Sequence, residues 1–236
     1  GLTPSQSERG LTPPGIPMIL AISDILSHSD VIALRDALAR ASFLPGETTA
    51  GWAAQAVKSN LQAHDSPEVD AMRSLVRTRL IEHPVFALAA RPKTIIGPLF
   101  ARYQPGHAYG THVDNALMDG ARSDLSFTLF LGDPADYDGG ELVIDTPSGE
   151  EAFKLAAGSV VTYPATSLHR VMPVTRGERP GAAGWVRSYL RDPAQRELLF
   201  DLETARRRLF EREGKTAEAD LLARCAANLM RMWCED

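Results

Sequence analysis

The sequence predicts a mainly β protein with flanking helices, in which a jelly-roll core is followed by a C-terminal helical hairpin. Short β-type runs bounded by Gly, Pro and Asp occupy residues 94–190. Amphipathic helical patterns precede and follow this region. With 236 residues, of which 44% are hydrophobic, the chain can bury one sizeable core and carry a small accessory unit.

Three segments are expected along the chain. Residues 1–17 are rich in Pro, Ser, Thr and Gly, which predicts a disordered leader or one added to the natural chain, with Met18 as a candidate start. Residues 18–190 are expected to form the main domain, with N-terminal helices and a jelly-roll core that starts near residue 94. Residues 191–236 are expected to form the helical hairpin.

Two helices are predicted before the β region. Ser27-His-Ser-Asp30 has the spacing of a capping box, and the apolar helical pattern that follows it stops at Pro45-Gly46. Ser66-Pro67 opens a second helix, because proline is favoured in the first helical turn. His83-Pro84 closes this helix, since proline disfavours helical backbone in the residue before it.

Eight short strands are predicted after the helices, and strands of this length and spacing are typical of a jelly roll. Their expected ranges are 95–103, 109–114, 125–131, 140–145, 151–155, 159–163, 168–174 and 183–190.

The C-terminal hairpin is predicted from two further helices. Asp192-Pro193 starts a helix that Gly214 ends, and Thr216 caps a last helix that reaches Trp233. One apolar face is expected to cover the sheet or to contact a second copy in a homodimer. This face consists of Leu198, Leu199, Leu202 and Leu209.

Charge and composition exclude several classes of protein. The net charge is −5 with a pI of about 5.7 and no basic run, which argues against nucleic-acid binding. No apolar run approaches the roughly 18 residues of a membrane span, and Asp24 interrupts the stretch after Met18 too early for a secretory signal. Cys225 and Cys234 are too few for a disulfide framework. We therefore expect a cytoplasmic protein that acts on a small molecule or a peptide.

His112-Val113-Asp114 is a candidate pair of metal ligands. Six histidines and 30 acidic residues among 236 (6 × 30/236) predict about 0.8 His-x-acid triplets by chance, so the triplet alone is weak. His28-Ser29-Asp30 also fits, but it lies at a predicted helix start, where positions i and i+2 point to different sides. His112 and Asp114 are expected on a strand, where positions i and i+2 share one face. Both side chains could then reach one ion.

His169 is the best-placed third ligand, in a late β-type run that follows the turn at Ala157-Gly158. Two histidines and one carboxylate on one face leave three octahedral positions open, as in non-haem Fe(II) oxygenases. Those positions would admit a co-substrate and oxygen. His107, in the turn before the first ligands, is expected to be a mobile lid residue rather than a fourth ligand.

Arg179 supplies a cation beyond His169. Its guanidinium can hold the distal carboxylate of a dicarboxylate whose other end chelates the metal, which indicates 2-oxoglutarate. Tyr103 could donate its hydroxyl to the same carboxylate. Taken alone, Arg179 would also fit a surface turn. Because Pro180-Gly181 follows and proline cannot donate to a central ladder, this strand is expected to start late or to be irregular, which puts co-substrate affinity in question.

A longer series of segments surrounds these residues in order. They are Phe100-Ala-Arg-Tyr103, Tyr109-Gly-Thr-His112-Val-Asp114-Asn-Ala, Arg122-Ser-Asp-Leu-Ser126, Leu129-Phe-Leu-Gly-Asp-Pro-Ala-Asp-Tyr-Asp-Gly-Gly-Glu-Leu142, Gly158 to His169-Arg-Val, and Phe200-Asp-Leu. This series resembles the bacterial PKHD-type hydroxylases, a prolyl/lysyl hydroxylase-like branch of the Fe(II)/2-oxoglutarate dioxygenases. The resemblance runs from about Met18 past Asp201.

The resemblance implies a double-stranded β-helix core with Fe(II) bound by His112, Asp114 and His169. It implies that Arg179 binds 2-oxoglutarate and that L-ascorbate keeps the iron reduced. The implied reaction hydroxylates a substrate and releases succinate and CO2. Some members of the family are associated with iron uptake through siderophore receptors, which suggests a context for this chain.

The substrate and two other functional classes stay open at this stage. Loop residues Lys58, Asn60, Gln62 and Asn115 are candidate substrate contacts, although such polar groups are more often simply solvated. A cupin-like metal-dependent isomerase or hydrolase could use the same ligands, but it would need no Arg179. The C-terminal hairpin could instead mark a binding or assembly module with a vestigial site.

Overall fold

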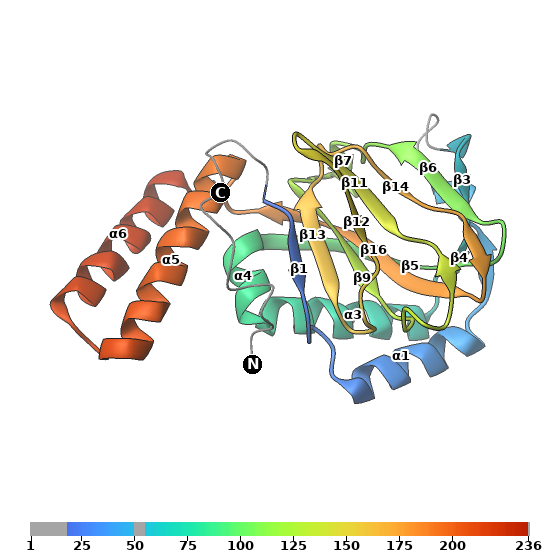
Figure 1. The fold of residues 1–236 in the computed structure, drawn as a ribbon, viewed down its shortest axis with the longest axis horizontal. Coiled ribbons are helices and arrows are strands. Elements are labelled where there is room, and N and C mark those ends of the chain that lie inside the picture. Colours follow the sequence, from blue (N-terminus) through green and yellow to red (C-terminus); the bar gives the residue numbers. More distant parts are fainter. Residues whose placement is uncertain (1–17, 50–54, 236) are drawn as a thin grey trace.

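The computed structural model describes residues 18–49 and 55–235, which form a β core flanked by helices (Figure 1). The predicted leader, residues 1–17, lies outside the described residues. Two sheets form the core, one of seven strands in the order β1-β13-β9-β16-β5-β4-β2 and one of five in the order β12-β11-β14-β6-β3. The predicted fold class, mainly β with a jelly-roll core and a C-terminal helical pair, is confirmed.

The seven-stranded sheet consists of β1 (Leu20–Ile22), β2 (Phe43–Pro45), β4 (Leu61–Ala63), β5 (Pro92–Tyr103), β9 (Leu125–Phe130), β13 (Val160–Pro164) and β16 (Arg179–Ser188). The five-stranded sheet consists of β3 (Lys58–Ser59), β6 (Ala108–His112), β11 (Leu142–Thr146), β12 (Gly149–Phe153) and β14 (His169–Val171). Two small ribbons pair β7 (Leu117–Met118) with β8 (Ala121–Arg122) and β10 (Asp138–Gly139) with β15 (Val174–Arg176). The 3-10 turn η2 covers Gly46–Thr49.

The helices are α1 (His28–Arg40), α3 (Pro67–Glu82), α4 (Pro84–Ala90), α5 (Pro193–Glu213) and α6 (Ala217–Trp233). The predicted capping box is present at α1, where the Ser27 hydroxyl accepts from the Asp30 N–H and the Asp30 carboxylate accepts from the Ser27 N–H, both at 3.1 Å. Asp30 also forms an ion pair of 3.0 Å with Arg79 of α3, which ties the two helices together. His28 is thus a helix-start residue, as predicted.

The main apolar core lies between the seven-stranded sheet and helices α1, α3 and α4. Side chains such as Leu34, Val76 and Phe86 from the helices meet Phe127 and Leu129 from β9. Pro84 closes α3 as predicted, but it also opens α4, which the sequence had not indicated. Strands β1 to β4 were not predicted either, because they are two or three residues long and show no alternation of their own.

The strand that carries Arg179 starts earlier than predicted. β16 begins at Arg179, whose partner on β5 is Tyr103, whereas pairing with β9 begins only at Gly181. In an antiparallel strand, the N–H and C=O of one residue point to the same neighbouring strand. The Pro180 carbonyl accepts from the N–H of Leu131, just past the end of β9, so the nitrogen of Pro180 also faces this end of β9. The missing N–H of Pro180 therefore falls at the end of a ladder. The predicted irregularity is found further along, where the register with β5 shifts twice.

The C-terminal hairpin does not cover the sheet. Helices α5 and α6 project to one side of the β core, next to α4 (Figure 1). A separate small core of Leu190, Leu199 and Ala226 holds them together. Leu198 is 54% exposed and does not share the buried face of Leu199, so the predicted face was wrong at that position.

Replacing Gly184 by alanine tests the close packing around β16. A Cβ at this position would lie 2.5 Å from the Phe127 ring and 2.8 Å from the Ile96 carbonyl oxygen, which the backbone cannot relieve. Gly184→Ala is therefore expected to lower the free energy of unfolding by about 1–3 kcal/mol, measured by urea denaturation. The neighbouring exposed variant Ala183→Ser should stay within about 0.5 kcal/mol of the wild type. A wild-type midpoint for Gly184→Ala would contradict the packing described.

Candidate metal centre

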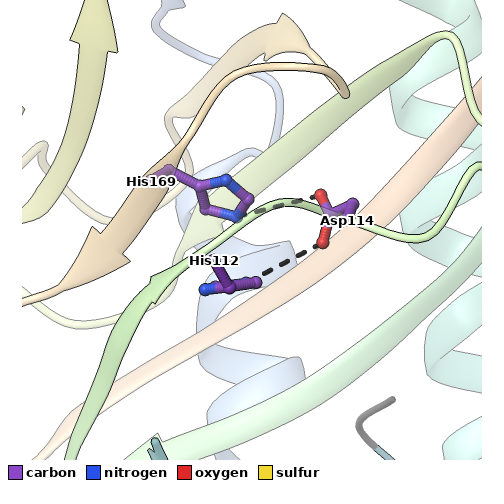
Figure 2. Close-up of side chains that lie close together, drawn as sticks. All are labelled: His112, Asp114 and His169. Carbon is purple, nitrogen blue, oxygen red and sulfur yellow. Dashed lines mark ion pairs between the residues drawn. The ribbon is translucent and has the colours of Figure 1, made fainter. Parts of the chain in front are cut away.

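His112, Asp114 and His169 converge in the interior of the β core (Figure 2). Their ligand atoms all lie within 4.8 Å of one another. The His112 Nε2 is 3.9 Å from Asp114 Oδ1, and the His169 Nε2 is 3.8 Å from Asp114 Oδ2. The three side chains are at most 12% exposed. Two imidazoles and a carboxylate at this spacing fit a divalent transition metal with open coordination positions.

Strand pairing brings the two histidines together. β6 and β14 are antiparallel neighbours, and His112 lies directly opposite His169. Asp114, however, does not extend a strand face as predicted, because β6 ends at His112. The aspartate reaches the site from the segment after the strand, where the Ser126 hydroxyl of β9 donates a 2.5 Å hydrogen bond to its Oδ2.

Backbone carbonyls fix the orientation of both imidazole rings. Nδ1 of His112 lies 2.9 Å from the Gly110 oxygen, and Nδ1 of His169 lies 3.0 Å from the Ser167 oxygen. A carbonyl only accepts, so each Nδ1 carries a hydrogen, and in each ring Nε2 is the nitrogen that faces Asp114. Burial, followed by the nearby His169, lowers the pKa of His112 to about 4. His112 is thus neutral near physiological pH, as a metal ligand must be.

Aromatic rings confine the two histidines. The Tyr109 ring stacks on His112 with centroids 3.7 Å apart, and Tyr163 lies edge-on to His169 at 5.0 Å. The sequence reasoning missed Tyr109, Tyr163 and Ser126. No local pattern marks them, because their contact with the ligands depends on which distant strands pair.

Arg179 enters the same cavity from β16. It is 3% exposed, and among the described residues its Nε and Nη2 have no hydrogen-bond partner. Its guanidinium carbon lies 5.1 Å from the Tyr103 ring and 5.4 Å from the Phe130 ring. A buried guanidinium with unused donors is costly unless an anion completes it, and its planar fork matches a carboxylate.

The other predicted site residues also line the cavity, with different surroundings. Tyr103 is buried, which raises its pKa, while Arg179 and a hydrogen bond with Asn60 act in the opposite direction. The Asn60 Oδ1 packs against Gly46, so this side chain also supports the wall of the cavity. Asn115 and Gln62 complete this part of the lining.

Lys58 is a buried cation on β3, which pairs with β6. Burial lowers its pKa to about 8, while the Asp114 carboxylate acts in the opposite direction. His107 is not among the cavity-lining residues or the ligand cluster of the described chain, and its Nδ1 accepts from the Gln104 N–H at 3.2 Å. The predicted lid role of His107 stays a prediction.

Comparison with known proteins gives consistent matches over most of the chain. The profile of the 2OG-Fe(II) oxygenase superfamily matches residues 98–187, and that of the PKHD-type hydroxylase C-terminal domain matches residues 193–235. A PKHD-type hydroxylase of Maricaulis maris is 51% identical, with 93% of this chain and 100% of that protein covered. One of Acaryochloris marina is 50% identical, with 92% and 100% covered.

Solved structures share the fold at lower identity. A Pseudomonas putida prolyl-4-hydroxylase superposes with a TM-score of 0.52 at 23% identity, covering 73% of this chain and 93% of that chain. HygX from Streptomyces hygroscopicus, solved with nickel and 2-oxoglutarate, gives a TM-score of 0.52 at 15% identity, covering 74% and 84%.

The hydrogen bond from Ser126 to Asp114 is expected to support metal binding. Ser126→Ala removes the donor that orients the carboxylate, so Co(II) affinity measured by calorimetry should fall about tenfold or more. Ser123→Ala is the matched control, because the Ser123 hydroxyl donates to the Asn115 carbonyl at 2.6 Å rather than to a ligand. If Ser126→Ala bound Co(II) as tightly as Ser123→Ala, the hydrogen bond from Ser126 would have no role in metal binding.

Proposed function

The chain belongs to the PKHD-type hydroxylases of the 2OG-Fe(II) oxygenase superfamily, and we propose that His112, Asp114 and His169 bind its Fe(II). The observation that carries this proposal is the shared cavity, in which a buried His-Asp-His cluster faces a buried arginine with unused donors. Two imidazoles and one carboxylate hold the metal on one side and leave the other side to ligands.

Bound there, ferrous iron supplies the oxygen chemistry that hydroxylates a substrate C–H bond while 2-oxoglutarate and O2 yield succinate and CO2. Arg179 binds the distal carboxylate of 2-oxoglutarate through its paired donors, and the Tyr103 hydroxyl donates to the same group. The rings of Tyr109 and Tyr163 hold the imidazoles in place and exclude water from their faces. L-ascorbate as the reductant that keeps the iron ferrous is part of the same proposal.

The substrate is a small molecule or a peptide, with Lys58, Asn60 and Asn115 as proposed contacts. Among the proteins of similar fold, one is described as a prolyl-4-hydroxylase and another was solved with hygromycin B bound, so the fold does not select between these classes. A homodimer, a cytoplasmic location and a link to iron uptake stay predictions of the sequence. Within the described residues, no helix combines the length and apolar character needed to span a bilayer.

The two alternative classes fit the cavity less well. A cupin-like isomerase or hydrolase would not require Arg179, which lines the same cavity as the three ligands. A binding module with a vestigial site would not need three ligand side chains held by carbonyl and hydroxyl hydrogen bonds.

Anaerobic titration tests the metal and co-substrate proposal directly. Adding 2-oxoglutarate to the Fe(II)-loaded protein is expected to produce a visible metal-to-ligand charge-transfer band, because both groups meet in one coordination sphere. His112→Ala should abolish the band, since it removes one of the three ligands. Absence of the band in the wild type, or its survival in His112→Ala, would contradict the proposed binding of Fe(II) and 2-oxoglutarate at this site.

The role of Arg179 can be separated from metal binding. Arg179→Gln removes a charge-assisted donor pair, so the Kd for 2-oxoglutarate read from the same band should rise by about tenfold or more. Co(II) affinity should not change. Arg176→Gln is the matched control, because Arg176 is exposed and pairs with Asp138 at 2.7 Å. An unchanged 2-oxoglutarate Kd in Arg179→Gln would place the co-substrate elsewhere.

A further inference from the structure

Tyr137 is a fully buried tyrosine whose hydroxyl has no part in the proposed function. It lies in the segment between β9 and β11, directly before Asp138-Gly-Gly-Glu-Leu142. The side chain is 1% exposed, and among the described residues its hydroxyl has no hydrogen-bond partner. A buried hydroxyl without a partner is costly, and phenylalanine would fill the same space without that cost. Packing alone therefore does not account for the hydroxyl.

Tyr137 lies directly beside Arg179. A Cβ on Gly140 would be 2.8 Å from the Arg179 Cδ and 3.2 Å from the Tyr137 Cε2, so the two side chains meet at this glycine. Burial raises the pKa of Tyr137, while the nearby Arg179 acts in the opposite direction. Neither the phenol oxygen nor the Arg179 Nε and Nη2 has a well-formed hydrogen bond within the described part of the chain. The two groups are nevertheless complementary, because the guanidinium only donates and the phenol oxygen can accept.

The ring of Tyr137 has a fixed position. Gly140 approaches it at Cε2, and a Cβ on Gly132 would lie 3.4 Å from Cε1 on the other edge. Lys154 places its Nζ 4.3 Å from the ring centre and donates to the Tyr137 carbonyl at 2.7 Å. The phenol is thus anchored, whereas arginine has a long side chain that loses rotamer freedom whenever it is held in place.

Arg179 lines the cavity, whereas Tyr137 is not among the described residues that line it. The phenol therefore meets the guanidinium from outside the space that the ligands would occupy. From this arrangement we propose that Tyr137 is a positioning residue for 2-oxoglutarate: its oxygen accepts from the Arg179 guanidinium and directs the remaining donors toward the distal carboxylate. The inference rests on the proposed function, because it assumes that Arg179 binds this carboxylate.

Positioning by Tyr137 lowers the cost of binding. Arg179 then loses its rotamer freedom before 2-oxoglutarate arrives rather than on binding, which increases the affinity. Gly140 is part of the same arrangement, because any side chain there would push Arg179 away from the phenol. The Asp138-Gly-Gly-Glu-Leu142 segment thus contributes to co-substrate binding without touching the ligand.

Tyr137→Phe tests the proposal, because it removes the hydroxyl and keeps the ring. The Kd for 2-oxoglutarate, read from the charge-transfer band of the Fe(II) form, is expected to rise about fivefold, since one hydrogen bond to a charged group is lost. Co(II) affinity should not change, because no metal ligand is altered. Tyr189→Phe is the matched control, since Tyr189 is 37% exposed and is not among the cavity-lining residues. It should keep the wild-type Kd.

A double-mutant cycle with Arg179→Met separates positioning from a merely structural role. Methionine removes every guanidinium donor, so Tyr137→Phe should leave the Kd for 2-oxoglutarate unchanged in this background. A structural role would weaken binding by the same factor in both backgrounds. That result, an unchanged Kd in the Tyr137→Phe single variant, or a loss of Co(II) affinity in it would overturn the positioning role.

The same band separates this failure from failure of the proposed function. A wild type without the band overturns the metal and 2-oxoglutarate proposal itself. A Kd that is unchanged in Arg179→Met overturns the role of the arginine. A Kd that depends on Arg179 but not on the Tyr137 hydroxyl overturns only the positioning role.

Discussion

The antiparallel pairing of β6 with β14 is the constraint on which the site depends, because it sets His112 opposite His169. Successive side chains of a strand point to opposite faces, so a slip of one residue would turn an imidazole out of the cavity. The pairing is anchored on its other side by β11, whose Ile144 lies opposite His169 and is fully buried. The metal centre is thus built where β6, β14 and β11 pair in succession within the smaller sheet.

The two sheets supply different parts of the chemistry. The five-stranded sheet provides His112, His169 and Lys58, and the seven-stranded sheet provides Arg179 and Ser126. Stacked sheets are about 10 Å apart, so side chains from both can reach one small ligand. In the proposed complex, 2-oxoglutarate would connect a metal on one sheet with a guanidinium on the other.

Concentrating buried charge in one cavity opposes folding, because each ionised group loses water. The apolar core on the opposite face of the seven-stranded sheet, packed by α1, α3 and α4, offsets this cost and holds β5, β9 and β16 in place. Arg179 and Tyr103 lie opposite each other on β16 and β5, and therefore keep a fixed separation. The pairing of β16 with β5 thus places the guanidinium and the phenol side by side in the cavity wall.

The sequence alone determined the features that local chemistry encodes. Helix caps, the helices that they open and the succession of β-type runs follow from hydrogen bonds and periodicities within short windows. The caps are Ser27, Ser66, Asp192 and Thr216. The sequence also predicted His112, Asp114, His169 and Arg179 as site residues. The structure brings these four side chains into one cavity.

Only the tertiary structure decided how that cavity is built. It showed that Asp114 reaches the site from beyond the end of β6 and is held by Ser126, that Lys58 is buried beside the ligands, and that the C-terminal hairpin projects away from the sheets. These features depend on pairing between segments that lie far apart in the chain, such as β3 with β6. The free energy of such a pairing is shared between two distant strands, so neither strand's own sequence specifies its partner.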